Sequence, residues 1–347
     1  MSPTTSDKRD ALSRRQVLAA AAFGPAIVSA HLAYAQGSGK FRFMTPFGYS
    51  LAFAPVLYAR AGGFLAKEGL DAEIIAGKGA ALAAQMTIAG QAEAARTGAG
   101  NYMVARINNG APLIAIATIA QVSPFYVLSP KAKPLAAPSS FPAKKIGMAS
   151  LGGSMEETLN LTLRRAGVDA ATVEKVKIAD TPASYALVEA GRVDGIMGNI
   201  STAMKAQAAF KDVAATRMDD GVPGQVYVAT PETLARNEAA YVAFLRGVHR
   251  AASAIIDARD DAKALDAIIA AMGKTFDLGT LDDPALARRD LTENAASWTA
   301  KGRDNLLRNV PELWAVAVEL MAEAGMLKTA PDAATLYTNA VLDKALR

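Results

Sequence analysis

The sequence predicts an α/β fold of two lobes, each a mostly parallel sheet flanked by helices. Three observations support this: a strand-loop-helix-strand unit near the start of the chain, a repeat of this pattern further along, and two strand-like stretches where the chain can cross between lobes. At 347 residues the chain is long enough for two domains that each bury a core.

The first unit covers residues 41–76. Apolar residues alternate at Phe41 and Phe43, the strand breaks at Pro46, and small and apolar residues then recur at helical spacing before a second strand over 71–76. Ligands of parallel sheets bind beyond the carboxyl ends of strands. The loop after the first strand is therefore a candidate binding segment, and it contains Phe47, Tyr49 and Ser50.

A glycine loop over 77–80 precedes a helix predicted over 81–89. Glycine there lets backbone N–H groups point at a ligand, and the dipole of the helix favours an anionic group. A simple turn between strand and helix is the alternative. A third strand over 93–97 leads to a small-residue segment over 98–102, which we expect to be a loop.

The pattern restarts with a strand over 145–149, a glycine loop over 151–154 and a helix over 155–166. Ser154 and Glu157 have the spacing of a capping box, so Ser154 has either a structural role at the helix start or a role in ligand binding.

The phrase at 190–199 repeats the pattern of 90–101, with the end of a helix, a glycine, a strand and a small-residue loop. We therefore expect the two halves of the chain to present matching loops to one cleft. The loop of the second copy nominates Asn199 as a ligand-binding residue.

Two strand-like stretches, 125–128 and 225–229, are the expected crossovers. They divide the chain into a first lobe of residues 36–127 and 229–347, which includes the C-terminal helices, and a second lobe of residues 128–228. Trp298 and Trp314 lie in the predicted C-terminal helices, where we expect them to pack in the core.

Residues 1–35 have the features of a twin-arginine signal peptide. Arg14 and Arg15 precede an apolar run over 17–30, and small residues suggest cleavage after Ala35, which predicts export to the periplasm. An uncleaved membrane anchor and a chance arginine pair are the alternatives.

Composition argues against several function classes. The chain has no cysteine, 37 basic against 33 acidic residues, and only scattered basic pairs, so it lacks the features of a nucleic-acid-binding protein. One histidine, His249, follows the leader, and no nucleophile elbow, zinc helix or P-loop occurs. We predict a protein that is not an enzyme and has no cofactor and no metal site.

The phrase Gly63-Phe64-Leu65-Ala66-Lys67-Glu68-Gly69-Leu70-Asp71-Ala72-Glu73 resembles a hallmark of a known family. It is similar to that of the periplasmic solute-binding proteins of the sulfonate, nitrate, taurine and thiamine-pyrimidine-precursor type, which serve ABC importers. The resemblance covers residues 41–244 well and the C-terminal helices loosely, and it departs from the family's usual aspartate at Glu93.

The resemblance implies a periplasmic binding protein fold, type II-like, in which two crossovers act as hinges and a small molecule is held between the lobes. It also implies a monomer that docks on a membrane permease with a separate ATPase. A periplasmic sensor that presents its closed form to a membrane receptor is an alternative. A pyrimidine synthase on this scaffold depends on histidine and a cysteine-rich motif, which the chain does not offer.

Two kinds of residue lie near the expected cleft. Glycine loops with Lys78 and Arg96 suit an anionic head group, and several aromatic residues suit a flat ring, so we expect a small organic ligand, anionic or aromatic, rather than nitrate. The candidate ligand-binding residues are Phe47, Tyr49, Ser50, Lys78, Gly79, Ala80, Gly100, Asn101, Gly152, Gly153, Ser154, Asn199 and Tyr227.

Overall fold

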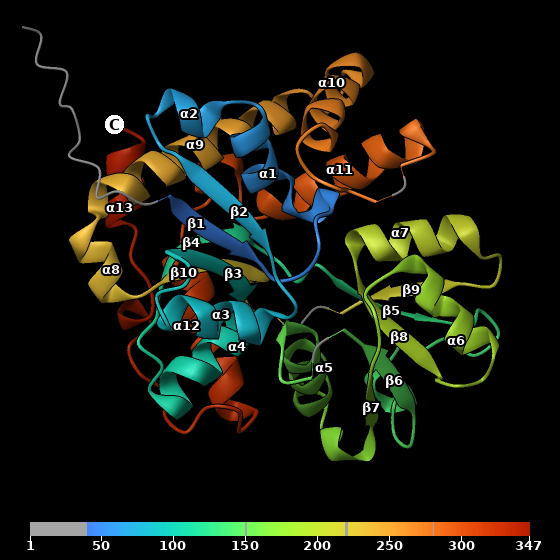
Figure 1. Ribbon diagram of the computed structural model, residues 1–347. Coiled ribbons are helices and arrows are strands. Elements are labelled where there is room, and N and C mark those ends of the chain that lie inside the picture. The colour runs from blue at the N-terminus through green and yellow to red at the C-terminus, as the bar shows by residue number, and fades with distance from the viewer. Residues whose placement is uncertain (1–39, 150, 219–220, 280) are drawn as a thin grey trace, which may run out of the picture. The chain divides into compact units, whose positions relative to one another are not determined.

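The computed structural model describes residues 40–149, 151–218, 221–279 and 281–347 (Figure 1). The predicted signal peptide lies outside the described residues. The described chain contains two five-stranded sheets flanked by helices, which confirms the predicted fold class.

The first sheet has the strand order β2-β1-β3-β10-β4. Its strand β1 is parallel to β2 and β3, whereas β10 is antiparallel to both of its neighbours. Its strands are β1 (Phe41–Thr45), β2 (Ala72–Ala76), β3 (Ala94–Gly98), β4 (Ile114–Ala120) and β10 (Gln225–Ala229). Strands β3 and β10 are buried throughout because both faces of this sheet are covered.

The second sheet repeats this design with the order β7-β6-β8-β5-β9. Here β6 is parallel to β7 and β8, and β5 is the antiparallel strand. Its strands are β5 (Phe125–Ser129), β6 (Lys145–Met148), β7 (Glu174–Lys177), β8 (Gly195–Asn199) and β9 (Ala214–Arg217). In each sheet the strand that follows a crossover runs against the other four.

Helices cover the faces of both sheets (Figure 1). They are α1 (Ala54–Ala61), α2 (Phe64–Lys67), α3 (Ala80–Ile88), α4 (Ala99–Met103), α5 (Ser154–Arg165), α6 (Ala186–Glu189), α7 (Ile200–Ala209), α8 (Pro231–Arg236), α9 (Glu238–Asp257), α10 (Ala262–Gly273), α11 (Pro284–Trp298), α12 (Pro311–Glu323) and α13 (Ala340–Ala345). None of the described helices combines the length and hydrophobicity that a membrane crossing requires.

Strand pairing corrects the expected lobe boundaries. The sequence analysis assigns residues 125–127 to the first lobe and 225–228 to the second, but β5 pairs entirely with the second sheet and β10 with the first. The chain therefore crosses just before each strand. The crossing segments touch, because the Gly224 N–H donates to the Ala120 carbonyl at 2.8 Å and a Cβ on Gly224 would lie 2.0 Å from the Val122 carbonyl oxygen.

Two local predictions are wrong. Residues 99–102, expected as a loop, belong to helix α4, because Tyr102 and Met103 bury against the C-terminal helix that carries Trp314. The capping box at Ser154 does not form, because Gly153 occupies the N-cap position and the Ser154 hydroxyl accepts from the backbone of Gly98 instead. Strand β9 was not predicted.

The C-terminal helices complete the first lobe. Phe41 and Phe43 on β1 stack on Phe244 of α9, with ring centroids 4.7 and 5.2 Å apart. Trp298 and Trp314 are 1% and 0% exposed, which confirms their expected place in the core. Helix α9 is thus part of the core rather than an appendage.

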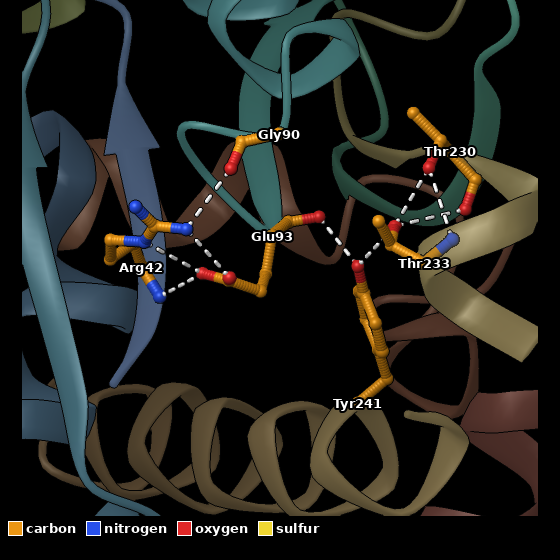
Figure 2. A network of polar contacts seen from close by, with 6 residues as sticks. All are labelled: Arg42, Gly90, Glu93, Thr230, Thr233 and Tyr241. Carbon is orange, nitrogen blue, oxygen red and sulfur yellow. Dashed lines mark hydrogen bonds and ion pairs between the residues drawn. The ribbon is translucent and has the colours of Figure 1, made fainter. Parts of the chain in front are cut away.

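Glu93 joins three elements of this lobe (Figure 2). Its carboxylate accepts from the Arg42 backbone N–H at 2.5 Å and pairs with the Arg42 guanidinium at 3.0 Å, while its carbonyl accepts from the Tyr241 hydroxyl at 2.6 Å. Thr233 at the start of α8 lies 2.9 Å from the same hydroxyl. Glu93, where the sequence departs from the family's usual aspartate, therefore has a structural role: it links these elements of the first lobe by hydrogen bonds and an ion pair.

Candidate functional site

Strand ends of both sheets meet at a cavity with about 430 Å³ of empty space, counted to its open mouth. The first lobe contributes the loop after β1, residues of β3 and β10 and the first residue of α3, and the second lobe contributes β5, the start of α5 and the end of β8. The lining residues are Pro46, Phe47, Ala52, Phe53, Ala80, Arg96, Pro124, Phe125, Ser154, Met155, Asp180, Asn199 and Gln225.

Arg96 is the cationic group of this cavity. It is only 4% exposed, its Nη1 donates to the Ala52 carbonyl at 2.7 Å, and its guanidinium lies 4.9 Å from the centre of the Phe53 ring. Burial lowers the pKa of Arg96 to about 10, and among the described residues it forms no ion pair. A desolvated cation without a carboxylate partner is costly, and an anionic ligand would supply the missing charge.

Gln225 extends the donor side of the site. Its Oε1 accepts from Arg96 Nε at 3.3 Å, which turns the amide so that Nε2 is the free end. That Nε2 is buried and forms no hydrogen bond with any described residue. The first lobe therefore offers a guanidinium and an unsatisfied amide donor side by side.

Asp180 is the acidic group on the opposite lobe. Its Oδ2 accepts from Asn199 Nδ2 at 2.7 Å. Its Oδ1 is buried, and no donor of the described chain meets the distance and angle of a well-formed hydrogen bond to it. The residue as a whole keeps some exposure. Burial raises the pKa of Asp180 to about 6, and hydrogen bonding by Thr202 and Asn199 offsets part of that rise.

Three helices begin at the cavity. Ala80 is the first residue of α3, Ser154 is the first residue of α5, and Asn199 is the N-cap of α7, with its Oδ1 accepting from the Thr202 N–H at 3.0 Å. Helix N-termini carry partial positive charge. The potential in the cavity is therefore favourable to a negative group beyond the contribution of Arg96.

The rest of the lining is largely apolar. Phe47 and Phe125 come from opposite lobes, and Met155 and two prolines complete the wall. Such a surface suits the hydrocarbon part of an organic molecule.

The lobes contact each other beside the cavity. The Gly98 N–H donates to Ser154 Oγ at 2.8 Å, and Asn101 Nδ2 donates to the Gly152 carbonyl at 2.7 Å. On another pair of helices, Ser201 Oγ of α7 donates to the buried Asp290 of α11 at 2.5 Å. These bonds join segments of the two lobes, so the lobes are in direct contact on both sides of the cavity.

The cavity brings together four of the residues nominated from sequence: Phe47, Ala80, Ser154 and Asn199. Gly100 and Asn101 line a small neighbouring hollow with Glu157, where burial raises the pKa of that carboxyl to about 7. Gly79 and Gly153 immediately precede α3 and α5, and Gly152 accepts from Asn101.

The other nominated residues lie outside the cavity lining. Lys78 is exposed, and Ser50 is half-buried before a short 3-10 helix. Tyr49 donates to the Ile74 carbonyl at 2.7 Å and packs against Phe276. Tyr227 is 1% exposed in the core of the first lobe.

The sequence analysis places Arg96 near the cleft as suited to an anionic head group but does not include it among the candidate ligand-binding residues, and it does not nominate Asp180 or Gln225. Arg96 and Gln225 lie within strands rather than in loops, and Asp180 precedes a helix start, where an acidic residue has an ordinary capping explanation. An arginine in an otherwise apolar buried strand was the available signal, because lone buried cations are rare.

Comparisons place the chain among proteins of this architecture. A protein from Bordetella bronchiseptica is 20% identical, with a TM-score of 0.70, over 88% of this chain and 96% of that one. The alkanesulfonate-binding protein SsuA of Xanthomonas axonopodis is 14% identical, with a TM-score of 0.62 over 86% and 98%. The periplasmic nitrate-binding protein NrtA of Synechocystis is 14% identical, with a TM-score of 0.61 over 88% of each chain.

A search of curated protein sequences finds no match. The profile described as NMT1/THI5 like matches residues 50–262, which is more than half of the chain and includes most strands of both sheets. This chain belongs to the NMT1/THI5-like family.

Proposed function

We propose that this protein captures a small organic anion between its two lobes and delivers it to the membrane permease of an ABC importer whose ATPase is a separate protein. It acts in the periplasm as a monomer, after export by the twin-arginine route and cleavage near Ala35. The observation that carries the proposal is Arg96, a buried guanidinium with no acidic partner in the described chain, at a cavity between the lobes.

The charge balance of the cavity supports an anionic ligand. A carboxylate or sulfonate placed against Arg96 would accept charge-assisted hydrogen bonds and would also satisfy Gln225 Nε2. The starts of α3, α5 and α7 add favourable dipoles. Arg96 and Gln225 Nε2 are already buried, so the free energy of binding is not reduced by a cost of desolvating them.

The wall of the cavity supports an organic molecule rather than an inorganic ion. Phe47, Phe125 and Met155 offer apolar surface to a hydrocarbon or ring, and nitrate would leave that surface unused. The similar solved proteins include binders of alkanesulfonate and of nitrate, so the fold is compatible with either class.

Isothermal titration of the full chain with aromatic and aliphatic carboxylates and sulfonates tests the proposal. We expect at least one acid to bind, and we expect Arg96→Gln to weaken it at least 30-fold, since removing one partner of a buried charged contact costs about 2–5 kcal/mol. Lys78→Gln removes an exposed cation that does not line the cavity, and should change the dissociation constant by less than about threefold.

If Arg96→Gln and Lys78→Gln weakened binding of the acid equally, the overall electrostatic field of the protein, and not the cavity, would be attracting the acid. Transport is tested separately: cells that lack this chain should lose ATP-dependent uptake of the acid identified. Retained uptake together with a lost chemotactic or transcriptional response would instead identify the protein as a sensor.

A further inference from the structure

The cavity has hydrogen-bonding groups of opposite kind on its two lobes. The polar side chains that the first lobe contributes to the lining are Arg96 and Gln225, and the buried Nε2 of Gln225 is a donor without a partner among the described residues. The second lobe contributes Asp180, which lines the cavity and whose carboxylate in the ionised state can only accept. A ligand that spans the lobes must match both.

We infer that the ligand is an acid that also carries a hydrogen-bond donor: its anionic group binds Arg96 and Gln225, and an amino, ring N–H or hydroxyl group on its other end donates to Asp180. This inference rests on the proposed function and specifies its substrate class. It makes Asp180 a specificity-determining residue.

The argument against a plain anion is energetic. A carboxylate, alkanesulfonate or nitrate has acceptors only, so lobe closure on it would add negative charge to a cavity lined by the Asp180 carboxylate and would supply that carboxylate with no donor. A donor on the ligand removes this penalty. Sites with a buried polar group that only the correct ligand satisfies reject analogues that lack the matching group.

The orientation of Asp180 allows a sharper test than simple loss of binding. Asn199 Nδ2 donates to Oδ2, and the Asn199 Oδ1 is itself engaged by the Thr202 N–H, so this amide cannot turn over freely. In an Asp180→Asn variant the new amide oxygen should therefore face Asn199, and the new NH₂ group should take the place of Oδ1. The site would then present a donor where the natural chain presents an acceptor.

The experiment compares acids in matched pairs: taurine with ethanesulfonate, β-alanine with propionate, and 4-aminobenzoate or 4-hydroxybenzoate with 4-methylbenzoate. Dissociation constants are measured at pH 7.5 for the full natural chain, for Asp180→Asn and for Asp194→Asn. Asp194 is a matched control on the same lobe, where it pairs with Lys144 at 3.1 Å and does not line the cavity.

For at least one pair, the acid with the donor should bind the natural chain at least tenfold tighter than its partner. This preference should disappear or reverse in Asp180→Asn and persist in Asp194→Asn. Equal binding of pair members, with binding still dependent on Arg96, would overturn this inference while the proposed function stands. Absence of binding by every acid, with Arg96→Gln indistinguishable from the natural chain, would overturn both.

Discussion

The Asn199 side chain donates to the Asp180 carboxylate across 2.7 Å and thereby fixes the orientation of an acidic group that lines the cavity. Both residues lie where the second sheet ends, Asn199 as the last residue of β8 and Asp180 in the segment after β7. Because Asn199 is also the N-cap of α7, the orientation of the acidic group is tied to the start of a helix.

The first prediction concerns the pH dependence of stability. Burial raises the pKa of Asp180 to about 6, so the folded state binds more protons than the unfolded chain between about pH 4 and pH 6. The stabilising contribution of this group is therefore complete below about pH 4 and is lost as the pH rises through 6.

We expect Asp180→Asn to be more stable than the natural chain at pH 7.5, by of order 1–3 kcal/mol, and to lose most of that advantage at pH 4. Urea unfolding at several pH values measures this. A stability difference that does not change with pH would contradict the raised pKa. Asp290→Asn gives a comparison, because burial also raises the pKa of Asp290 to about 6 at a different place between the lobes.

The second prediction separates stability from binding at Arg96. Replacing this unpaired buried guanidinium by methionine keeps a long side chain against Phe53 and removes the desolvated charge. Arg96→Met should therefore raise the free energy of unfolding of the ligand-free protein by about 1 kcal/mol while abolishing anion binding. Calorimetry and titration of the same preparation measure the two effects. A variant that is destabilised and still binds acids would contradict the assignment.

The third prediction concerns the contact between lobes at Gly98. A Cβ there would lie 2.5 Å from the Cβ and Oγ of Ser154, so Gly98→Ala forces the start of α5 away from β3. We expect ligand affinity to fall at least tenfold through a destabilised closed form.

Gly100→Ala is the matched control, because the nearest atoms to its Cβ are 3.7 Å away, an ordinary contact. It lies inside α4, where alanine is favoured over glycine, and it should leave affinity unchanged. Small-angle scattering in saturating ligand should show a larger radius of gyration for Gly98→Ala than for Gly100→Ala. Identical affinities for the two variants would show that this contact does not limit closure.

The fourth prediction concerns the polar network around Glu93. Tyr241→Phe removes the hydroxyl that donates to the Glu93 carbonyl at 2.6 Å and leaves that carbonyl without this partner (Figure 2). We expect a loss of about 1–2 kcal/mol in the free energy of unfolding, with ligand affinity unchanged. Tyr58→Phe is the control, since the Tyr58 hydroxyl has no hydrogen bond to a described residue. Equal losses in the two variants would contradict a specific role for the network.

The strands were largely predictable because their physical signals are local. β4 and β10 read as continuous apolar runs, as sheets covered on both faces require, and both crossover strands were identified from such runs. Strand β9 was missed because it is a short edge strand of the sequence Ala-Ala-Thr-Arg that is half-buried and has no alternation to detect.

The site was predictable only where it consists of strand-end loops and helix starts. Ligands bind where strands end and helices begin, and this rule identifies Phe47, Ala80, Ser154 and Asn199. It does not identify the polar lining residues Asp180 and Gln225. Arg96 lies opposite Tyr227 in the β3–β10 pair, so its surroundings depend on a pairing between segments more than 100 residues apart. Such register is set by the whole sheet and cannot be read from either segment alone.

The position of β10 has a consequence for the order of folding. Strands β3 and β4 are not neighbours; β10 pairs between them, although it is made about a hundred residues after β4. The second sheet, by contrast, is formed by one uninterrupted stretch from β5 to β9. Strands that are far apart in the sequence pair late, because the chain loses the entropy of closing a long loop before the pairing can stabilise it. We therefore expect the second lobe to acquire its structure as an inserted unit, and the first lobe to gain its central strand only when the completed insert has brought both crossing segments together.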